Sequence, residues 1–156
     1  MIEINIPGFK HLKLAHLVLD YNGTLAVDGA LFPGVQERLQ RLAAEVHIHI
    51  ITADTFGQVR ATVADLPCTL HILPRQAQAE AKRDYVRGLD ADGTVCIGNG
   101  RNDRLMLAEA ALGIAVILAE GACSACVTTA DVVCRDINDA LDLLRHPLRL
   151  TATLRE

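Results

Sequence analysis

Aromatic residues are scarce in this chain of 156 residues. Only 3% of the residues are aromatic and none is tryptophan, although 51% are hydrophobic. The core must therefore be built from Ala, Val, Leu and Ile side chains, as in a parallel sheet that helices cover on both faces. The length fits one domain with a sizeable core, so we expect residues 1–156 to fold as a single domain.

Other absences exclude classes of function. The formal net charge is −4 and no basic stripe is present, which argues against a nucleic-acid partner. No apolar stretch approaches the roughly 18 residues that a membrane-spanning helix needs. Residues 1–5 carry an acid in place of the Lys or Arg that begins a signal peptide. We therefore expect a cytoplasmic protein with no membrane partner.

The five cysteines, an odd number, fit a reducing compartment better than a disulfide framework. Cys123 and Cys126 form a CxxC pair, which can be redox-active or bind zinc. A zinc site needs about four ligands, and the sequence has neither a second CxxC nor a nearby histidine pair. A packing or loop role is favoured, with metal or redox chemistry as the alternative.

Two histidines alternate with apolar residues in one predicted strand. His47 and His49 should face the same side of that strand, and neither lies at its carboxyl end. Histidines covered by a helix are favoured over a metal-binding face.

Strand-like and helix-like segments alternate along the chain. The predicted strands are 17–19, 46–51, 69–73, 95–97, 114–118 and 132–134, and the predicted helices are 35–44, 56–66, 77–89, 103–112 and 137–144. This alternation predicts βαβ units with right-handed crossovers around a parallel sheet. Pro33 and Gly34 should open the first helix, and Gly113 should cap the fourth. Residues 2–6 are interpreted as an edge strand, and the residues after Pro147 as a loosely specified tail.

A carboxylate stands at the end of the first predicted strand. Asp20 follows the apolar run 16–19, and Gly23 and Thr24 then begin a turn. In open α/β sheets, ligands bind at the carboxyl ends of the strands. An aspartate there can act as a nucleophile, while backbone N–H groups of the turn face an anion.

The next predicted strand ends in Thr52, Ala53 and Asp54. The threonine hydroxyl and neighbouring backbone N–H groups could donate to phosphate oxygens. The alternative is a helix N-cap formed by Thr52, Asp54 or Thr55.

The hexapeptide GNGRND, residues 98–103, follows the strand 95–97. Its glycines allow a close approach of the backbone, and its Asn and Asp residues offer oxygen ligands that suit a hard cation. The alternative is a glycine-rich turn capped by Asp103. Lys82 precedes this motif on a helix, where a lone lysine is usually solvated.

In this order, the motifs resemble those of the haloacid dehalogenase superfamily, and more narrowly the phosphorylation domain of P-type ATPase pumps in a soluble form. DYNGT at 20–24 matches the pumps' DKTGT, TAD at 52–54 matches TGD, and GNGRND matches GDGxND. Further along, LGIAV and ADVV are similar to the pumps' GIAMG and ADIVL. The resemblance runs from about residue 17 to residue 144 and implies a Rossmann-like three-layer α/β/α sandwich.

The resemblance also implies the chemistry. Asp20 would attack phosphorus and form an aspartyl-phosphate that water then cleaves, with Mg²⁺ bound by the Asp20 side chain and the Asn22 backbone carbonyl. The implied catalytic residues are Asp20, Asn22, Thr52 and Lys82; the phosphate-binding residues are Asp20, Gly23, Thr52, Ala53 and Lys82; the metal ligands are Asp20, Asn22, Asn99 and Asp103; and the supporting residues are Thr24, Asp54, Gly98, Gly100 and Asn102.

Two positions depart from the family pattern. Asn22 stands where many phosphatases of the superfamily have the Asp that acts as general acid and base, a role commonly worth about 10² to 10⁴ in rate. Asn99 stands where the motif usually has a metal-binding Asp. We therefore expect slow turnover or activity limited to good leaving groups. The alternative is a catalytically weak binding or regulatory module.

The segments in which relatives carry a lid are short. Only residues 25–33 precede the first helix, and residue 73 leads almost directly into the helix of Lys82. The protein should therefore be essentially capless and open to a small phosphorylated substrate. Because capless relatives often oligomerise, the resemblance also favours a homo-oligomer. The nucleotide-binding domain of the pumps is absent from this stretch, which argues against ATP as the donor.

Overall fold

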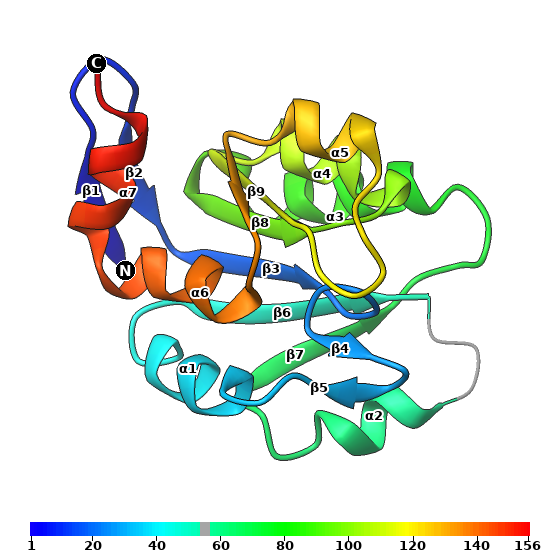
Figure 1. The fold of residues 1–156 in the computed structure, drawn as a ribbon. Helices are drawn as coiled ribbons and strands as arrows, with labels where there is room; N and C mark the ends of the chain where they lie inside the picture. Colours follow the sequence, from blue (N-terminus) through cyan, green and yellow to red (C-terminus); the bar gives the residue numbers. More distant parts are fainter. Residues whose placement is uncertain (54–56) are drawn as a thin grey trace.

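The computed structural model describes residues 1–53 and 57–156 (Figure 1). Its centre is a six-stranded sheet in the order β10-β9-β8-β3-β6-β7, in which all neighbouring strands are parallel. The strands are β3 (His16–Asp20), β6 (His47–Thr52), β7 (Cys68–Ile72), β8 (Thr94–Gly98), β9 (Leu112–Val116) and β10 (Val132–Cys134). All six predicted strands are confirmed, with ends that shift by no more than two residues.

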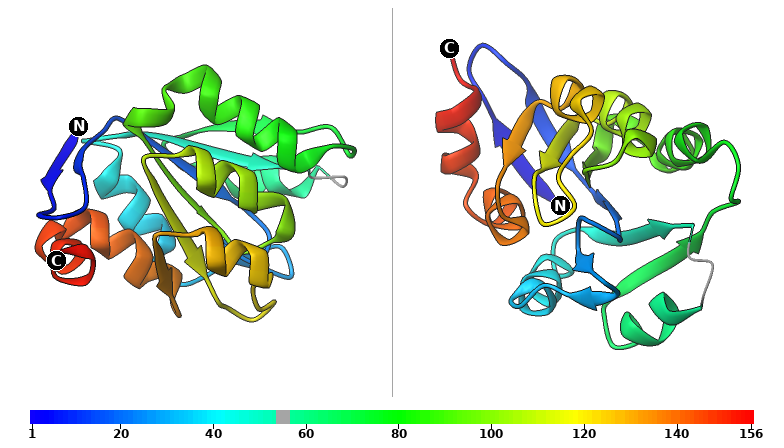
Figure 2. Two further views of the ribbon diagram at one scale, coloured as in Figure 1. Left: turned by 90° about the horizontal axis from the view of Figure 1, so that it is seen from above. Right: turned by 45° about the vertical axis from the view of Figure 1, so that its right-hand side comes forward.

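Helices cover both faces of this sheet, so the three-layer α/β/α sandwich is confirmed (Figures 1 and 2). One face carries α1 (Val35–Leu42), α2 (Gln58–Thr62) and α6 (Ile137–Arg145), and the other carries α3 (Gln78–Leu89), α4 (Arg104–Glu109) and α5 (Ser124–Thr129). A separate cluster of buried aliphatic side chains fills each interface between helices and sheet. The sheet is therefore buried on both faces, as the composition predicts.

Local sequence accounts for the start of α1. Gly34 has a φ of 86°, a left-handed conformation that glycine adopts without strain. Val35, Leu39 and Leu42 then form the expected buried stripe against the sheet. The helix therefore begins where Pro33 and Gly34 predict.

The expected cap at Gly113 is wrong, because Gly113 lies within β9. Helix α4 ends at Glu109, and Ala110 follows in an extended conformation. A Cβ atom on Gly113 would come within 2.6 Å of the Leu107 carbonyl oxygen. The glycine therefore serves close packing of the strand against the helix. Helix α2 is also shorter than predicted, and α5 was not predicted.

The two ends of the chain differ from expectation. Strand β1 (Ile2–Asn5) does not join the edge of the main sheet but pairs antiparallel with β2 (His11–Leu14). The predicted loose tail is helix α7 (Pro147–Leu154), whose Leu150 is completely buried. Proline at the first helical position favours this helix start. The apolar packing of α7 against the β1–β2 hairpin explains why the segment is ordered.

The described residues contain no lid domain over the carboxyl edge of the sheet. A small hairpin of β4 (Ala26–Val27) and β5 (Ala30–Leu31) follows β3, and residues 73–77 link β7 to α3. Two single turns of 3₁₀-helix, η1 (Ala91–Gly93) and η2 (Arg101–Asp103), flank β8. Within residues 1–53 and 57–156 the fold is therefore essentially capless, as expected. Among the described residues, no helix is both long and apolar enough to cross a membrane.

Candidate active site

The carboxyl ends of β3, β6 and β8 bring the sequence motifs together at one edge of the sheet. Asp20 lies beside Ile51 of β6, and Leu19 lies beside Ile97 of β8. At this edge is a polar cavity of about 340 Å³. It is lined by Asp20, Asn22, Thr52, Ala53, Gln78, Asn99, Gly100, Asn102 and Glu120. Asp54 and Thr55 lie outside the described residues.

Lys82 joins two carboxylates beneath this cavity. Its Nζ atom donates to Asp20 Oδ1 and to Asp103 Oδ1, both at 2.6 Å. Lys82 and Asp103 are completely buried, and Asp20 is 7% exposed. Because α3 crosses the sheet near this edge, its lysine is not solvated but is held in a fixed position between strand ends.

Burial and charge set the protonation of these groups. Burial, followed by the negative charge of Asp103, raises the pKa of Asp20 to about 6, although Lys82 acts in the opposite direction. Burial by itself lowers the pKa of Lys82, but the two carboxylates outweigh it and raise that pKa above its ordinary value. The lysine is therefore a permanent cation, while Asp20 gains its full charge only above mildly acidic pH.

Both carboxylate oxygens of Asp103 accept hydrogen bonds from other groups of the protein and do not face the cavity as free ligands. Its Oδ1 accepts from Lys82, and its Oδ2 accepts from the backbone N–H groups of Asn99 (2.9 Å) and Gly100 (2.8 Å). A Cβ atom on Gly98 would lie 2.5 Å from Asp103 Cγ, so glycine is required for this packing. The expectation that Asp103 binds metal directly is therefore corrected. Its contacts fit a residue that positions Lys82 and the loop.

The turn after Asp20 also requires a correction. The Gly23 N–H, expected to face phosphate, donates to the Ala26 carbonyl at 2.8 Å. Gly23 has a φ of 78°, and a Cβ atom there would collide with Glu120 Oε2 and Asn99 Nδ2. Glycine at this position therefore allows close approach rather than anion binding.

Thr24 and Asn99 connect the strand ends by hydrogen bonds. The Thr24 hydroxyl lies 3.2 Å from Asp20 Oδ2 and 3.1 Å from Asn99 Oδ1. Asn99 Nδ2 donates to the Gly121 carbonyl at 3.0 Å. Thr24 is completely buried, as the role of a supporting residue requires.

Two cavity residues were missed in the sequence. Gln78 accepts a hydrogen bond from Asn102 Nδ2 at 2.8 Å, and Glu120 lies on the loop after β9. The signal for Glu120 was present, because Glu120 and Gly121 form an acid–glycine pair just beyond a predicted strand. Gln78 had no such signal, since its role depends on where α3 crosses the sheet.

The oxygen atoms at the rim suit a small divalent cation. Asp20 offers a carboxylate oxygen, Asn99 an amide oxygen, and the exposed Asn22 a backbone carbonyl. Within residues 1–53 and 57–156, no cluster of three or more His, Cys, Asp or Glu residues could hold a metal ion unaided. Oxygen donors of this kind suit a hard divalent cation that retains several of its waters.

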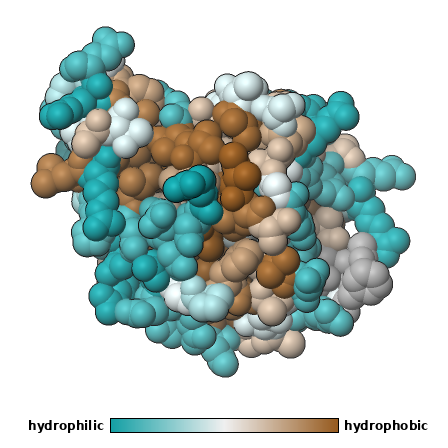
Figure 3. Space-filling model, in the orientation of Figure 1, coloured by the Kyte–Doolittle hydropathy of each residue, from teal (hydrophilic) through white to brown (hydrophobic). Residues whose placement is uncertain are grey.

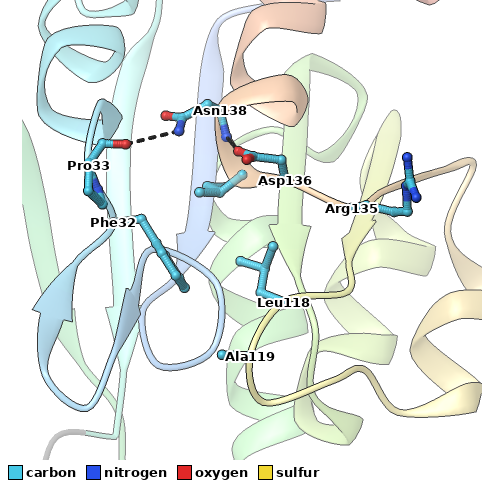
Figure 4. A pocket seen from close by; sticks show the side chains of 8 residues that line it. Phe32, Pro33, Leu118, Ala119, Arg135, Asp136 and Asn138 are labelled. Atoms are coloured by element: carbon cyan, nitrogen blue, oxygen red, sulfur yellow. Dashed lines mark hydrogen bonds between the residues drawn. The ribbon is translucent and has the colours of Figure 1, made fainter.

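A second hollow, of about 430 Å³, is lined in part by Leu118 and Ala119 of the loop after β9 (Figure 4). Its walls include Phe32, Leu118 and Ile137. Asn138 Nδ2 donates to the Pro33 carbonyl at 3.0 Å at its upper edge. Polar groups of Arg135, Asp136 and Asn138 also line this hollow, but it contains none of the strand-end motif residues, so we place phosphate chemistry in the first cavity.

Apart from His47, the cysteines and histidines that the sequence offers for metal or redox chemistry lie in packing positions. The Cys123 and Cys126 thiols are free, and burial raises the pKa of Cys126 to about 12, which leaves that thiol unreactive. His49 is buried beneath α3, where it contacts His16 at 3.1 Å and the Tyr85 hydroxyl at 3.0 Å. The buried, helix-covered position is therefore confirmed for His49 but is wrong for His47, which is exposed at the start of β6.

Comparison with known proteins gives relatives in sequence. No protein-family model matches the chain. An uncharacterized protein of Methanocaldococcus jannaschii is 55% identical over 62 residues, which are 40% of this chain and 67% of that protein. A second uncharacterized protein of the same organism is 49% identical over 39 residues, which are 25% of this chain and 89% of that protein. The chain therefore belongs to the same family as the first of these proteins.

Solved structures identify the fold. The cobalt-bound deoxy-D-mannose-octulosonate 8-phosphate phosphatase of Haemophilus influenzae has a TM-score of 0.72 at 16% identity, covering 92% of this chain and 94% of that chain. The corresponding enzyme of Moraxella catarrhalis, in complex with magnesium, phosphate and KDO, has a TM-score of 0.66 at 19% identity and the same coverage. The catalytic domain of the CPx-ATPase CopB-B has a TM-score of 0.62 at 24% identity, covering 74% of this chain and 46% of that chain. The fold is that of the haloacid dehalogenase superfamily.

Proposed function

We propose that the protein is a Mg²⁺-dependent phosphohydrolase in which Asp20 is the nucleophile. The observation that carries this proposal is the pairing of Asp20 with the completely buried Lys82 at the floor of a polar cavity. A lysine in this position neutralises the carboxylate and can also meet the oxygens of an incoming phosphoryl group. The phosphatases among the structural neighbours support the same reaction class.

The reaction requires two displacements at phosphorus. An Asp20 carboxylate oxygen forms a bond to phosphorus as the bond to the leaving-group oxygen breaks, and the electron pair departs with that oxygen. Water then attacks the phosphorus of the aspartyl-phosphate, which releases inorganic phosphate, returns the carboxylate and loses a proton to solvent. Lys82 and the Thr52 hydroxyl would hold the phosphoryl oxygens through both steps. When bound, Mg²⁺ would neutralise phosphoryl charge from a position beside Asp20, Asn22 and Asn99.

Asn22 sets the expected rate. It is exposed at the rim of the cavity, and its carboxamide cannot protonate a leaving group. Substrates whose leaving group departs without a proton, such as aryl and acyl phosphates, should therefore react faster than alkyl esters. The absence of a lid among the described residues leaves the cavity open and fits a small phosphorylated substrate.

A hydrolysis assay with p-nitrophenyl phosphate and Mg²⁺ tests this proposal. The Asp20→Asn variant should lose about 10³-fold or more of the wild-type rate, because it removes the nucleophile. Asp28→Asn is the matched control: this acid is exposed on the β4–β5 hairpin and should leave the rate unchanged. Hydrolysis that persists in Asp20→Asn would remove Asp20 from the mechanism.

A binding or regulatory module is the second candidate. Asn22 and Asn99 motivate it, because both replace groups that the superfamily uses for turnover. An absence of wild-type turnover on a panel of aryl and acyl phosphates would favour this candidate. A crystal soaked with beryllofluoride and Mg²⁺ would then show whether anion and metal still share the cavity.

We also propose a homo-oligomer formed through the edge of the sheet at β10. Ile117, which follows the end of β9, is 43% exposed, and Val133 of β10 is 42% exposed; Ile117 N donates to the Cys134 carbonyl. Figure 3 shows apolar surface across the middle of this face of the molecule. Light scattering of the wild type and of a Val133→Lys variant would test this interface. The single-domain organisation of residues 1–156 and the cytoplasmic location stay predictions.

A further inference from the structure

The loop after β9 carries an acidic side chain into the cavity. A turn closes when Gly121 N donates to the Leu118 carbonyl at 2.9 Å, and Gly121 adopts a φ of 70°. Glu120, just before that glycine, is exposed and lines the polar cavity. Its Oε2 atom lies so close to Gly23 that a Cβ atom there would collide with it. The turn thus brings a carboxylate against the motif of the nucleophile.

Asn99 fixes this turn in place. Its Nδ2 atom donates to the Gly121 carbonyl at 3.0 Å, and its backbone carbonyl accepts from Cys123 N at 2.8 Å. An aspartate at position 99 has no side-chain hydrogen to donate, and its charge would repel the Gly121 carbonyl. The amide at position 99 therefore holds the turn that carries Glu120, a contact that an ionised aspartate could not make.

The contacts continue from Glu120 to the nucleophile. Glu120 Oε2 and Asn99 Nδ2 both lie close to the position that a Cβ atom on Gly23 would occupy, and Asn99 Oδ1 lies 3.1 Å from the Thr24 hydroxyl. That hydroxyl lies 3.2 Å from Asp20 Oδ2. Glu120 therefore stands at the same rim as the oxygen donors that fit Mg²⁺.

Charge at the site points in the same direction. Beneath the cavity, Lys82 neutralises one of its two carboxylate partners, Asp20 and Asp103. Glu120 adds another negative charge at the rim, so the described part of the site holds more carboxylates than cations. A divalent cation would balance this excess, and it would find carboxylate oxygens on two sides.

We infer that Glu120 supplies the metal-binding carboxylate that Asn99 lacks, and that the acidic ligand has moved from the end of β8 to the turn after β9. This inference rests on the proposed function, because it concerns the metal of that same site. It gives Asn99 a positioning role: its amide orients the turn, and Glu120 binds the cation. The metal would then have two carboxylate ligands, Asp20 and Glu120, and both of these residues line the cavity.

Metal titration with the purified protein tests this inference apart from catalysis. We would measure Mg²⁺ binding by calorimetry, and Mn²⁺ binding by electron paramagnetic resonance as a second probe. Glu120→Gln should lower the affinity for both ions by about tenfold or more, because it removes a charged ligand while retaining the shape of the side chain. Glu45→Gln is the matched control, since Glu45 is exposed before β6, at the opposite edge of the sheet.

A rescue experiment sharpens the result. In the Glu120→Gln background, Asn99→Asp should restore most of the lost affinity, because the carboxylate returns to the end of β8. In the wild-type background the same change should release the turn, which loses the bond to the Gly121 carbonyl. Equal affinity of Glu120→Gln and wild type for both ions would overturn the inference, and so would a failure of Asn99→Asp to recover binding in a folded double variant.

The two proposals can fail separately. If wild type binds Mg²⁺ through Glu120 but turns over no phosphate ester, the proposed function fails and the inference stands. If Asp20-dependent hydrolysis is present while Glu120→Gln binds metal like the wild type, the inference fails and the function stands. Glu120 is exposed, so thermal unfolding without metal should be the same for Glu120→Gln and wild type.

Discussion

The floor and the rim of the cavity are built on different principles. At the floor, Lys82 and Asp103 are completely buried, and each carboxylate oxygen of Asp103 has a protein partner. At the rim, Asn22 and Glu120 are exposed. A buried charge must keep its partners, because a lost partner leaves it uncompensated in a medium of low polarity. The rim is solvated at Asn22 and Glu120, so these two residues can change at little cost to folding, whereas Asn99 is buried among hydrogen-bond partners.

The largest effect is expected from breaking the floor. Lys82→Met should abolish hydrolysis and lower the free energy of unfolding by about 3 to 5 kcal/mol, because two buried carboxylates lose their cation. Urea unfolding measures the second effect. Lys13→Met provides the control, since its only described ion pair, with Glu3 at 3.8 Å, is exposed and contributes little. Equal stability of the Lys82 and Lys13 variants would contradict the importance assigned to burial.

The rim should respond with rate rather than stability. Asn22→Asp places a carboxyl group where a leaving group departs, so the kcat for alkyl phosphates should rise by about 10²-fold. The increase should be smaller for p-nitrophenyl phosphate, whose leaving group needs no proton. Because Asn22 is exposed, the unfolding midpoint should not change. An equal increase for both substrates would point to stronger metal binding instead of proton transfer.

The pKa of Asp20 predicts a pH dependence of stability in metal-free protein. The folded-state pKa is about 6, above the ordinary value of 3.8, so the unfolded chain loses this proton first as pH rises. Stability should therefore fall between about pH 4 and pH 6 and stay low above that range. Asp20→Asn should remove this fall, which thermal melts in EDTA from pH 4 to pH 8 would show. A parallel decline in the variant would assign the effect to another group.

A smaller effect is expected under the helix that carries Lys82. Burial, followed by the neighbouring His16 and His47, lowers the pKa of His49 to about 4 from its ordinary value of 6.5. The unfolded chain therefore binds the proton first on acidification, and stability should decrease as pH falls from about 6.5 to 4. His49→Gln should flatten the profile of thermal midpoint against pH in this window. The exposed His11 gives the control variant, His11→Gln, which should keep the wild-type slope.

Much of the fold could be predicted from the chain itself. Short aliphatic runs without aromatic residues indicated strands buried on both faces, and all six are present in the sheet. The errors concern contacts with distant segments. The sequence pattern predicts that Gly113 caps a helix, but the glycine instead allows β9 to pack closely against the Leu107 backbone. That contact depends on how α4 packs against β9. Helix α7 was missed because its order comes from packing against the N-terminal hairpin.

In the candidate site, too, the positions of residues could be predicted but their contacts could not. Residues at strand ends could be located from the motifs alone, because parallel strands end at one edge of a sheet. The partners of individual atoms could not. Asp103 was expected at the metal, yet its Oδ2 binds two backbone N–H groups. Glu120 lies 100 residues beyond Asp20 in the chain and meets its motif only through a turn that Asn99 holds.

The amino-acid sequence by itself determined the alternation of strands and helices, the strand-end position of Asp20 and the absence of a proton donor at position 22. These properties depend on residue types and local spacing, which a single chain displays directly. Only the tertiary structure decided that Lys82 is buried between two carboxylates, that the Gly23 amide is occupied and that Glu120 lines the same cavity as Asp20. Those outcomes depend on distances between segments far apart in the chain, and packing of the whole sheet sets them.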